Sequence, residues 1–117
     1  MRNATVIVIG AMALALLVPR AARAATPSEA CDFVLLSASK AVDARKAGSS
    51  NDAISNSLRS ENEERRTFDA AVPERFIDKF LRDLFTGEYD QMSSGLELFD
   101  GSGYYARRFR TECLKQF

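Results

Sequence analysis

The sequence predicts an all-α fold, a small bundle of four to five helices with one disulfide joining the N- and C-terminal helices. Apolar residues recur at the three- and four-residue spacing of helices with one buried face, and no stretch alternates polar and apolar residues as a half-buried strand does. Two cysteines, Cys31 and Cys113, lie close to the two ends of the chain that follows an apolar leader. No internal repeat divides the sequence.

The first 24 residues have the pattern of a cleavable signal peptide. Arg2 precedes an apolar run from Val6 to Val18, and Ala22-Arg23-Ala24 places small residues at the two positions that flank a signal-peptidase cut. A membrane anchor is the alternative, but thirteen helical residues span only roughly 20 Å of a hydrocarbon core ~30 Å thick. We therefore expect residues 1–24 to be a signal peptide and residues 25–117 to be a single small helical domain. The expected location is the bacterial periplasm, with secretion as the alternative.

The first helix of this domain is expected at about residues 27–47. Thr26-Pro27-Ser28-Glu29 is a capping-box sequence with proline at the first helical position, and Gly48 suits the C-terminal stop. The inner face of this helix is predicted from residues at helical spacing: Cys31, Val34, Leu35, Ala38, Val42 and Arg45.

The polar stretch 49–71 is expected to hold two short helices. The first begins at one of two capping residues, Ser50 or Asn51, and is pinned to the core by Ile54 and Leu58. Ser60 and Glu63 form a second capping-box pattern, so another helix is expected from there to about Ala71. Pro73 predicts a break or a bend, because proline cannot continue a helix without a kink.

Residues 72–86 are predicted to form the core helix, which Gly87 ends. Apolar side chains cover about half of its circumference: Phe76, Ile77, Phe80, Leu81, Leu84 and Phe85. So wide an apolar arc indicates packing against more than one neighbour. Residues 88–103 are predicted to be a loop because they hold three glycines. Four apolar residues in this loop are expected to fold onto the core: Met92, Leu96, Leu98 and Phe99.

The last helix is predicted at about residues 104–116. Its buried side is expected to carry Tyr105, Ala106, Phe109, Cys113 and Phe117. Because Cys31 also lies on a buried face, and because export leads to an oxidising compartment, the two cysteines are predicted to form a disulfide. Closing a loop of about 83 residues destabilises the unfolded chain by up to ~4–5 kcal/mol. The alternatives are an intermolecular bridge, free thiols or a redox site, although the C-x-x-C spacing of redox sites is absent.

Charge and composition argue against several classes of function. Without the three arginines of the leader, 13 basic residues face 16 acidic ones, a net charge of −3 over 93 residues. Nucleic-acid binding and polybasic membrane attachment both rely on an excess of cations, so neither is expected. After removal of the signal peptide, no membrane span is expected.

The chain contains no histidine, which removes the commonest general base and the commonest metal ligand. We therefore predict no metal site, no cofactor and no catalytic residue. An acidic cluster offers carboxylates for hydrolysis: Glu61, Glu63, Glu64 and Asp69. The simpler interpretation is a solvated helix N-terminus, where the helix dipole favours acidic residues.

The candidate binding surface is on the last helix, where aromatic and basic residues are mixed. Residues 101–117 carry a net charge of +3, whereas residues 61–100 carry eleven acids and five bases. One interpretation is charge complementarity within the fold. The other is a recognition face for an acidic envelope protein or an anionic surface, formed by Tyr104, Arg107, Arg108 and Lys115.

The chain resembles a set of small exported helical proteins of proteobacteria and their phages that have no assigned activity. The resemblance rests on Cys31 near the start of the first helix, on Ala44-Arg45-Lys46-Ala47-Gly48 at its end, and on Cys113. In size, export and helical character the chain is also similar to periplasmic immunity proteins that neutralise cell-wall amidase toxins. Neither resemblance assigns a role to a residue.

Three functions remain open at this point. The first hypothesis is a non-enzymatic periplasmic binding module, similar to an inhibitor or an immunity protein. The second is a small cell-envelope hydrolase that depends on Glu63 and Glu64. The third is a chaperone-like stress protein with exposed apolar surface. The lack of histidine and the aromatic and basic character of the last helix favour the first.

Overall fold

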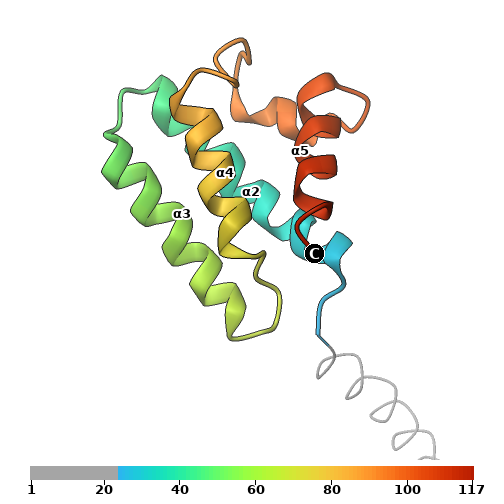
Figure 1. The fold of residues 1–117 in the computed structure, drawn as a ribbon. Coiled ribbons are helices and arrows are strands. Elements are labelled where there is room, and N and C mark those ends of the chain that lie inside the picture. The colour runs from blue at the N-terminus through green and yellow to red at the C-terminus, as the bar shows by residue number, and fades with distance from the viewer. Residues whose placement is uncertain (1–23) are drawn as a thin grey trace, which may run out of the picture.

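The computed structural model describes residues 24–117 and confirms the all-α prediction for them. Its elements are four α-helices and one 3-10 helix: α2 (Pro27–Lys46), α3 (Asn51–Arg66), α4 (Glu74–Phe85), η1 (Gly95–Phe99) and α5 (Tyr104–Leu114). Helices α3 and α4 run side by side, and α5 lies on the other side of α4 from α3 (Figure 1). The long helix α2 contacts α3, η1 and α5, and α4 packs against α3.

Helix α2 begins and ends close to where the sequence predicts. The Thr26 hydroxyl accepts from the Glu29 N–H at 3.2 Å, and the Glu29 carboxylate accepts from the Thr26 N–H at 3.0 Å, which completes the capping box. At the other end Gly48 adopts φ +87°, a left-handed conformation that glycine reaches without strain. The inner face buries Cys31, Val34, Ala38 and Val42 as expected.

Helix α3 corrects the prediction of two short helices. It is one continuous helix from Asn51 to Arg66, capped by the Ser50 hydroxyl, which accepts from the Ala53 N–H at 3.1 Å. Ser60 and Glu63 therefore lie inside the helix and form no cap. The helix also ends before the expected Ala71, because residues 67–70 make a turn in which Asp69 has φ +54°.

Helix α4 is the core helix that its apolar arc predicts. Its N-cap is Pro73, at the expected break, and five of its residues are buried: Phe76, Ile77, Phe80, Leu81 and Leu84. The Phe109 ring of α5 packs edge-on against both Phe76 and Phe80, with ring centres 5.2 and 5.6 Å apart. Edge-to-face aromatic pairs of this kind add about 0.5–1.5 kcal/mol each beyond the area they bury.

The segment between α4 and α5 follows the prediction only in part. Met92 and Leu98 are buried as expected, but Leu96 is 72% exposed and Phe99 is 48% exposed. The reason is that residues 95–99 form the helix η1, which turns only one side towards α2. Gly95 touches α2 so closely that a Cβ atom there would lie 2.1 Å from the Ser39 carbonyl oxygen.

The Cys31–Cys113 disulfide is present and joins α2 to α5, as predicted. The two Cα atoms are 6.0 Å apart, an ordinary separation for a disulfide, and both cysteines are almost fully buried. Phe117 departs from the prediction, since it lies beyond the end of α5 and is 51% exposed.

The described residues include no helix that is both long enough and apolar enough to cross a membrane. The predicted signal peptide, residues 1–24, lies outside the described residues except for its last residue, Ala24.

Candidate binding surface

Helix α5 carries all four residues of the candidate surface, but only three of them are turned towards solvent. Tyr104 is the first residue of the helix and is 62% exposed, and Lys115 is its C-cap, with a side chain 64% exposed. They lie eleven residues apart, about three helical turns, so they share one face. Arg107 is also exposed and lies one turn after Tyr104.

Arg108 is engaged within the fold. Its guanidinium donates to the Glu88 carboxylate at 3.0 Å, lies 3.7 Å from the Asp83 carboxylate, and is 5.8 Å from the centre of the Tyr89 ring. The hydrogen bond to Glu88 raises the pKa of Arg108 further above its ordinary value. Because only 23% of this side chain is exposed, Arg108 mainly ties α5 to the end of α4.

A row of aromatic rings leads from this surface into the core. Tyr104 packs edge-on against Tyr105, with ring centres 5.2 Å apart. The ring centres of Tyr105 and Tyr89 are 5.9 Å apart, and those of Tyr89 and Phe80 are 5.1 Å apart. Burial raises the pKa of the Tyr89 phenol well above its ordinary value. The exposed Tyr104 ring is therefore held by packed neighbours, which limits the conformational freedom it would lose on binding.

A groove lies beside the candidate surface, between α2, η1 and α5. Its volume is about 220 Å³, and we call it the α5 groove; its lining includes Leu35, Leu98, Phe99, Ala106, Phe109 and two arginines, Arg107 and Arg110. Arg110 donates to Asp32 and Ser28 on α2. Arg107 makes no ion pair or hydrogen bond through its side chain with any residue from 24 to 117, so it is the free cation of the groove.

A second hollow of about 260 Å³ lies between α2 and α3. Small residues and serines make up most of its lining: Ser37, Ala41, Ala44, Ser49, Ala53 and Ser57. Lys40 stands at this hollow and pairs with Glu61. Burial alone would raise the pKa of Glu61, but hydrogen bonds from Lys40 and Ser37 outweigh burial and lower it.

The predicted acidic cluster has a different setting from the one expected. Glu61, Glu63 and Glu64 lie in the C-terminal half of α3, so the expected helix N-terminus is wrong and the dipole of this helix does not stabilise them. Neighbouring cations pair with two of them instead. Glu61 pairs with Lys40, and Glu63 accepts from Arg66 at 3.0 Å.

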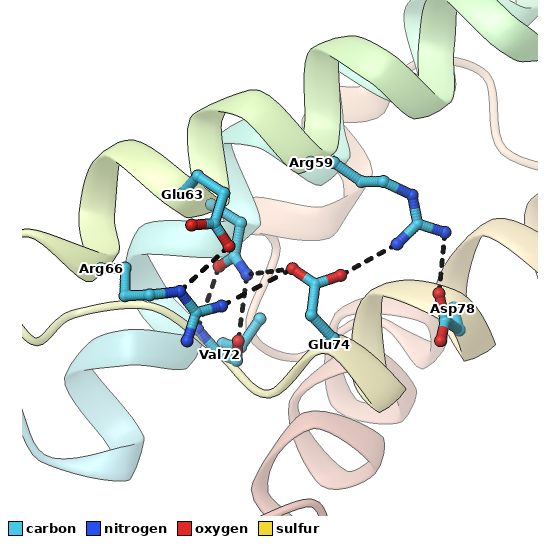
Figure 2. A network of polar contacts seen from close by, with 7 residues as sticks. Arg59, Glu63, Arg66, Val72, Glu74 and Asp78 are labelled. Atoms are coloured by element: carbon cyan, nitrogen blue, oxygen red, sulfur yellow. Dashed lines mark hydrogen bonds and ion pairs between the residues drawn. The ribbon is translucent and has the colours of Figure 1, made fainter.

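A polar network between α3 and α4 was not foreseen from the sequence. Figure 2 shows Glu74 between Arg59, at 2.9 Å, and Arg66, at 3.6 Å. Arg59 also reaches Asp78 at 2.7 Å, and this hydrogen bond raises the pKa of the guanidinium. The network holds the beginning of α4 against α3.

The buried member of this network is Asn62, which is 0% exposed. Its side chain donates to the Val72 carbonyl and accepts from the Val72 N–H, both at 3.0 Å. A sequence signal for it exists, because Ile54, Leu58 and Asn62 repeat every four residues. An asparagine that continues an apolar stripe indicates a buried amide with a specific partner.

No group of three or more metal-ligating side chains occurs within residues 24–117. Comparison with protein-family models, with curated proteins and with solved structures finds no match for this chain.

Proposed function

We propose that this chain is an exported, non-enzymatic binding module that recognises an acidic protein of the cell envelope through the outer face of α5. The observation that carries the proposal is the free guanidinium of Arg107 beside the exposed ring of Tyr104. Arginine and tyrosine are the residue types on which binding energy concentrates at protein interfaces. Lys115 extends the same basic face by two further turns.

The disulfide supports placing this module outside the cytoplasm. A buried bridge between α2 and α5 forms and persists in oxidising compartments such as the bacterial periplasm. The sequence pattern of residues 1–24 points to the same compartment. A partner is therefore expected among proteins of the envelope, in the manner of an inhibitor or an immunity protein.

The setting of the carboxylates favours binding over hydrolysis. A general acid needs a raised pKa, yet hydrogen bonds lower the pKa values of the Glu61 and Asp100 carboxyls. Glu63 is 59% exposed and paired with Arg66. Neither Glu63 nor Glu64 belongs to the lining of the two hollows described above.

The test compares two charge reversals at cations of the same kind. Arg107 and Arg82 are both exposed, and neither side chain makes an ion pair or hydrogen bond within residues 24–117. Arg82 lies on α4 and is not one of the residues of the candidate surface. We expect the immobilised, disulfide-bonded protein to capture a stoichiometric partner from a periplasmic extract, and Arg107→Glu to lower the affinity at least about tenfold while Arg82→Glu leaves it unchanged.

Two results would contradict this proposal. One is a partner whose affinity is the same for the wild type and for Arg107→Glu. The other is turnover of peptidoglycan by the purified protein that disappears when Glu63 and Glu64 are changed to glutamine, because that result would establish the hydrolase instead.

A further inference from the structure

We infer that this protein self-associates head to tail, with Phe68 of one copy inserted into the α5 groove of a second copy. The inserted element is the turn of residues 67–70 between α3 and α4, which we call the apex. This contact goes beyond the proposed function, since it joins two copies of the chain and brings in the apex, although its groove shares Arg107 with the outer face of α5.

The apex presents a large apolar side chain on a fixed backbone. Phe68 is 77% exposed, more than any other large apolar residue that the structure describes. The N–H groups of Phe68 and Ala70 both donate to the Arg65 carbonyl at 3.0 Å, and the Asp69 carbonyl accepts from the Ala25 N–H at 3.2 Å. These bonds hold the turn in place, so a partner does not have to order it on binding.

Two acidic residues lie close to Phe68 in sequence. Asp69 follows it, and Glu64 precedes it by one helical turn. Neither carboxylate pairs with a cation among residues 24–117, although Arg66, which lies between them in sequence, is held by Glu63 and Glu74. The apex therefore carries an exposed aromatic ring, with the carboxylates of Glu64 and Asp69 close to it in sequence.

The α5 groove has the complementary properties. Its volume of about 220 Å³ is below the ~300 Å³ at which small-molecule pockets begin, so it suits one side chain better than a whole ligand. Leu35, Leu98 and Ala106 give it an apolar lining, and Arg107 supplies a free positive charge. An aromatic ring with adjacent carboxylates satisfies both features of the groove, and the apex carries that combination.

The two surfaces belong to different parts of one molecule. The apex lies at the end of the α3–α4 pair, whereas the groove is lined by α2, η1 and α5 (Figure 1). A contact between different patches is heterologous, and repetition of it gives a ring if the rotation closes and an open chain if it does not. Every copy carries one apex and one groove, so association continues as the concentration rises.

Sedimentation of the disulfide-bonded protein tests this arrangement. We expect the average mass of the wild type to rise between about 10 µM and 1 mM, and to rise less in high salt because salt screens the charges. Phe68→Ser and Arg107→Glu should each lower the association constant at least about tenfold. Phe117→Ser and Arg82→Glu are matched controls, since both residues are exposed and neither lines the groove, and they should associate as the wild type does.

A mixture of the two deficient variants gives the decisive result. Phe68→Ser retains an intact groove and Arg107→Glu retains an intact apex, so an equimolar mixture should form 1:1 dimers and nothing larger. A wild type that stays monomeric at 1 mM, an association that survives either substitution, or a mixture without heterodimers would each overturn the inference. Binding of an acidic partner to the outer face of α5 does not require Phe68, so capture by Phe68→Ser tests the proposed function separately.

Discussion

Replacement of Asn62 by alanine tests whether one buried amide holds the connection between α3 and α4. The Asn62 side chain makes a reciprocal pair with the backbone of Val72, with both hydrogen bonds at 3.0 Å. A longer contact of 3.4 Å reaches the Glu74 carboxylate. The pair positions the chain immediately before the start of α4, the helix that supplies two of the four aromatic side chains buried within residues 24–117.

The magnitude follows from what alanine leaves behind. Val72 is 1% exposed, so its N–H and C=O would lose their partners in a place that water does not reach. An unsatisfied buried polar group costs about 1–3 kcal/mol, and two of them give an expected loss of ~2–6 kcal/mol in the free energy of unfolding. Even a loss of ~2 kcal/mol lowers the melting temperature of a domain this size by roughly 8–16 °C.

The assay is urea unfolding followed by circular dichroism, with the disulfide kept intact. Asn56→Ala is the matched control, because Asn56 lies on the same helix and is exposed. Its free energy of unfolding should change by less than ~0.5 kcal/mol. If Asn62→Ala loses no more stability than Asn56→Ala, the reasoning about the Val72 backbone is refuted.

Three further predictions concern the disulfide, the close backbone contact at Gly95 and the buried phenol of Tyr89. Cys113→Ser should lower the free energy of unfolding by up to ~4–5 kcal/mol, and its melting curve should match that of the reduced wild type. Gly95→Ala places a Cβ atom 2.1 Å from the Ser39 carbonyl oxygen and should destabilise the fold by ~1–3 kcal/mol in thermal melts, whereas Gly101→Ala meets no atom within 4 Å and should not. Burial raises the pKa of Tyr89, so the unfolded chain releases this proton near pH ~10 while the folded chain keeps it. Stability should therefore fall as the pH rises above ~10. The difference in urea midpoint between pH 8 and pH 11 should be smaller in Tyr89→Phe than in the wild type.

The sequence predicts α2, α4 and the disulfide well because each depends on a signal within its own segment. The capping box at Thr26 and the apolar arc of residues 74–85 specify where these helices lie and which sides they bury. Once both cysteines lie on buried faces, packing of those faces brings the thiols together. Periodicity is sufficient where the pattern is strong and uninterrupted.

Helix α3 shows where that reasoning fails. A capping box is a local pattern, and Ser60 with Glu63 satisfies it although both residues lie inside a helix. Asn62 adds to the wrong prediction of two helices. It follows Ile54 and Leu58 in the same stripe, and a polar residue at that position suggests that the buried face has ended. Its partner, Val72, is ten residues away, and no local pattern reports that contact.

Side-chain direction in η1 and at the end of α5 could not be derived from residue type. Leu96 and Phe99 are apolar but exposed, because η1 packs against α2 through Gly95 and these two side chains point elsewhere. The α5 groove has the same origin, since its lining comes from three elements that are distant in sequence. Such features depend on the packing of helices, which the pattern within one helix does not contain.

In the folded protein, the excess of positive charge at the C-terminal end does not form a broad basic surface. Arg108 and Lys115, two cations of the C-terminal segment, pair with acids of the same fold, and Arg110 is bound to Asp32. Most of the polarity therefore serves contacts within the domain, each worth about 0–1 kcal/mol at an exposed site. What remains for recognition is Arg107, beside apolar and aromatic surface, together with Lys115, whose side chain is 64% exposed and 3.9 Å from Glu112. Binding through α5 should then depend on shape and on one or two ion pairs, so its affinity should vary less with salt than binding through a polybasic patch does.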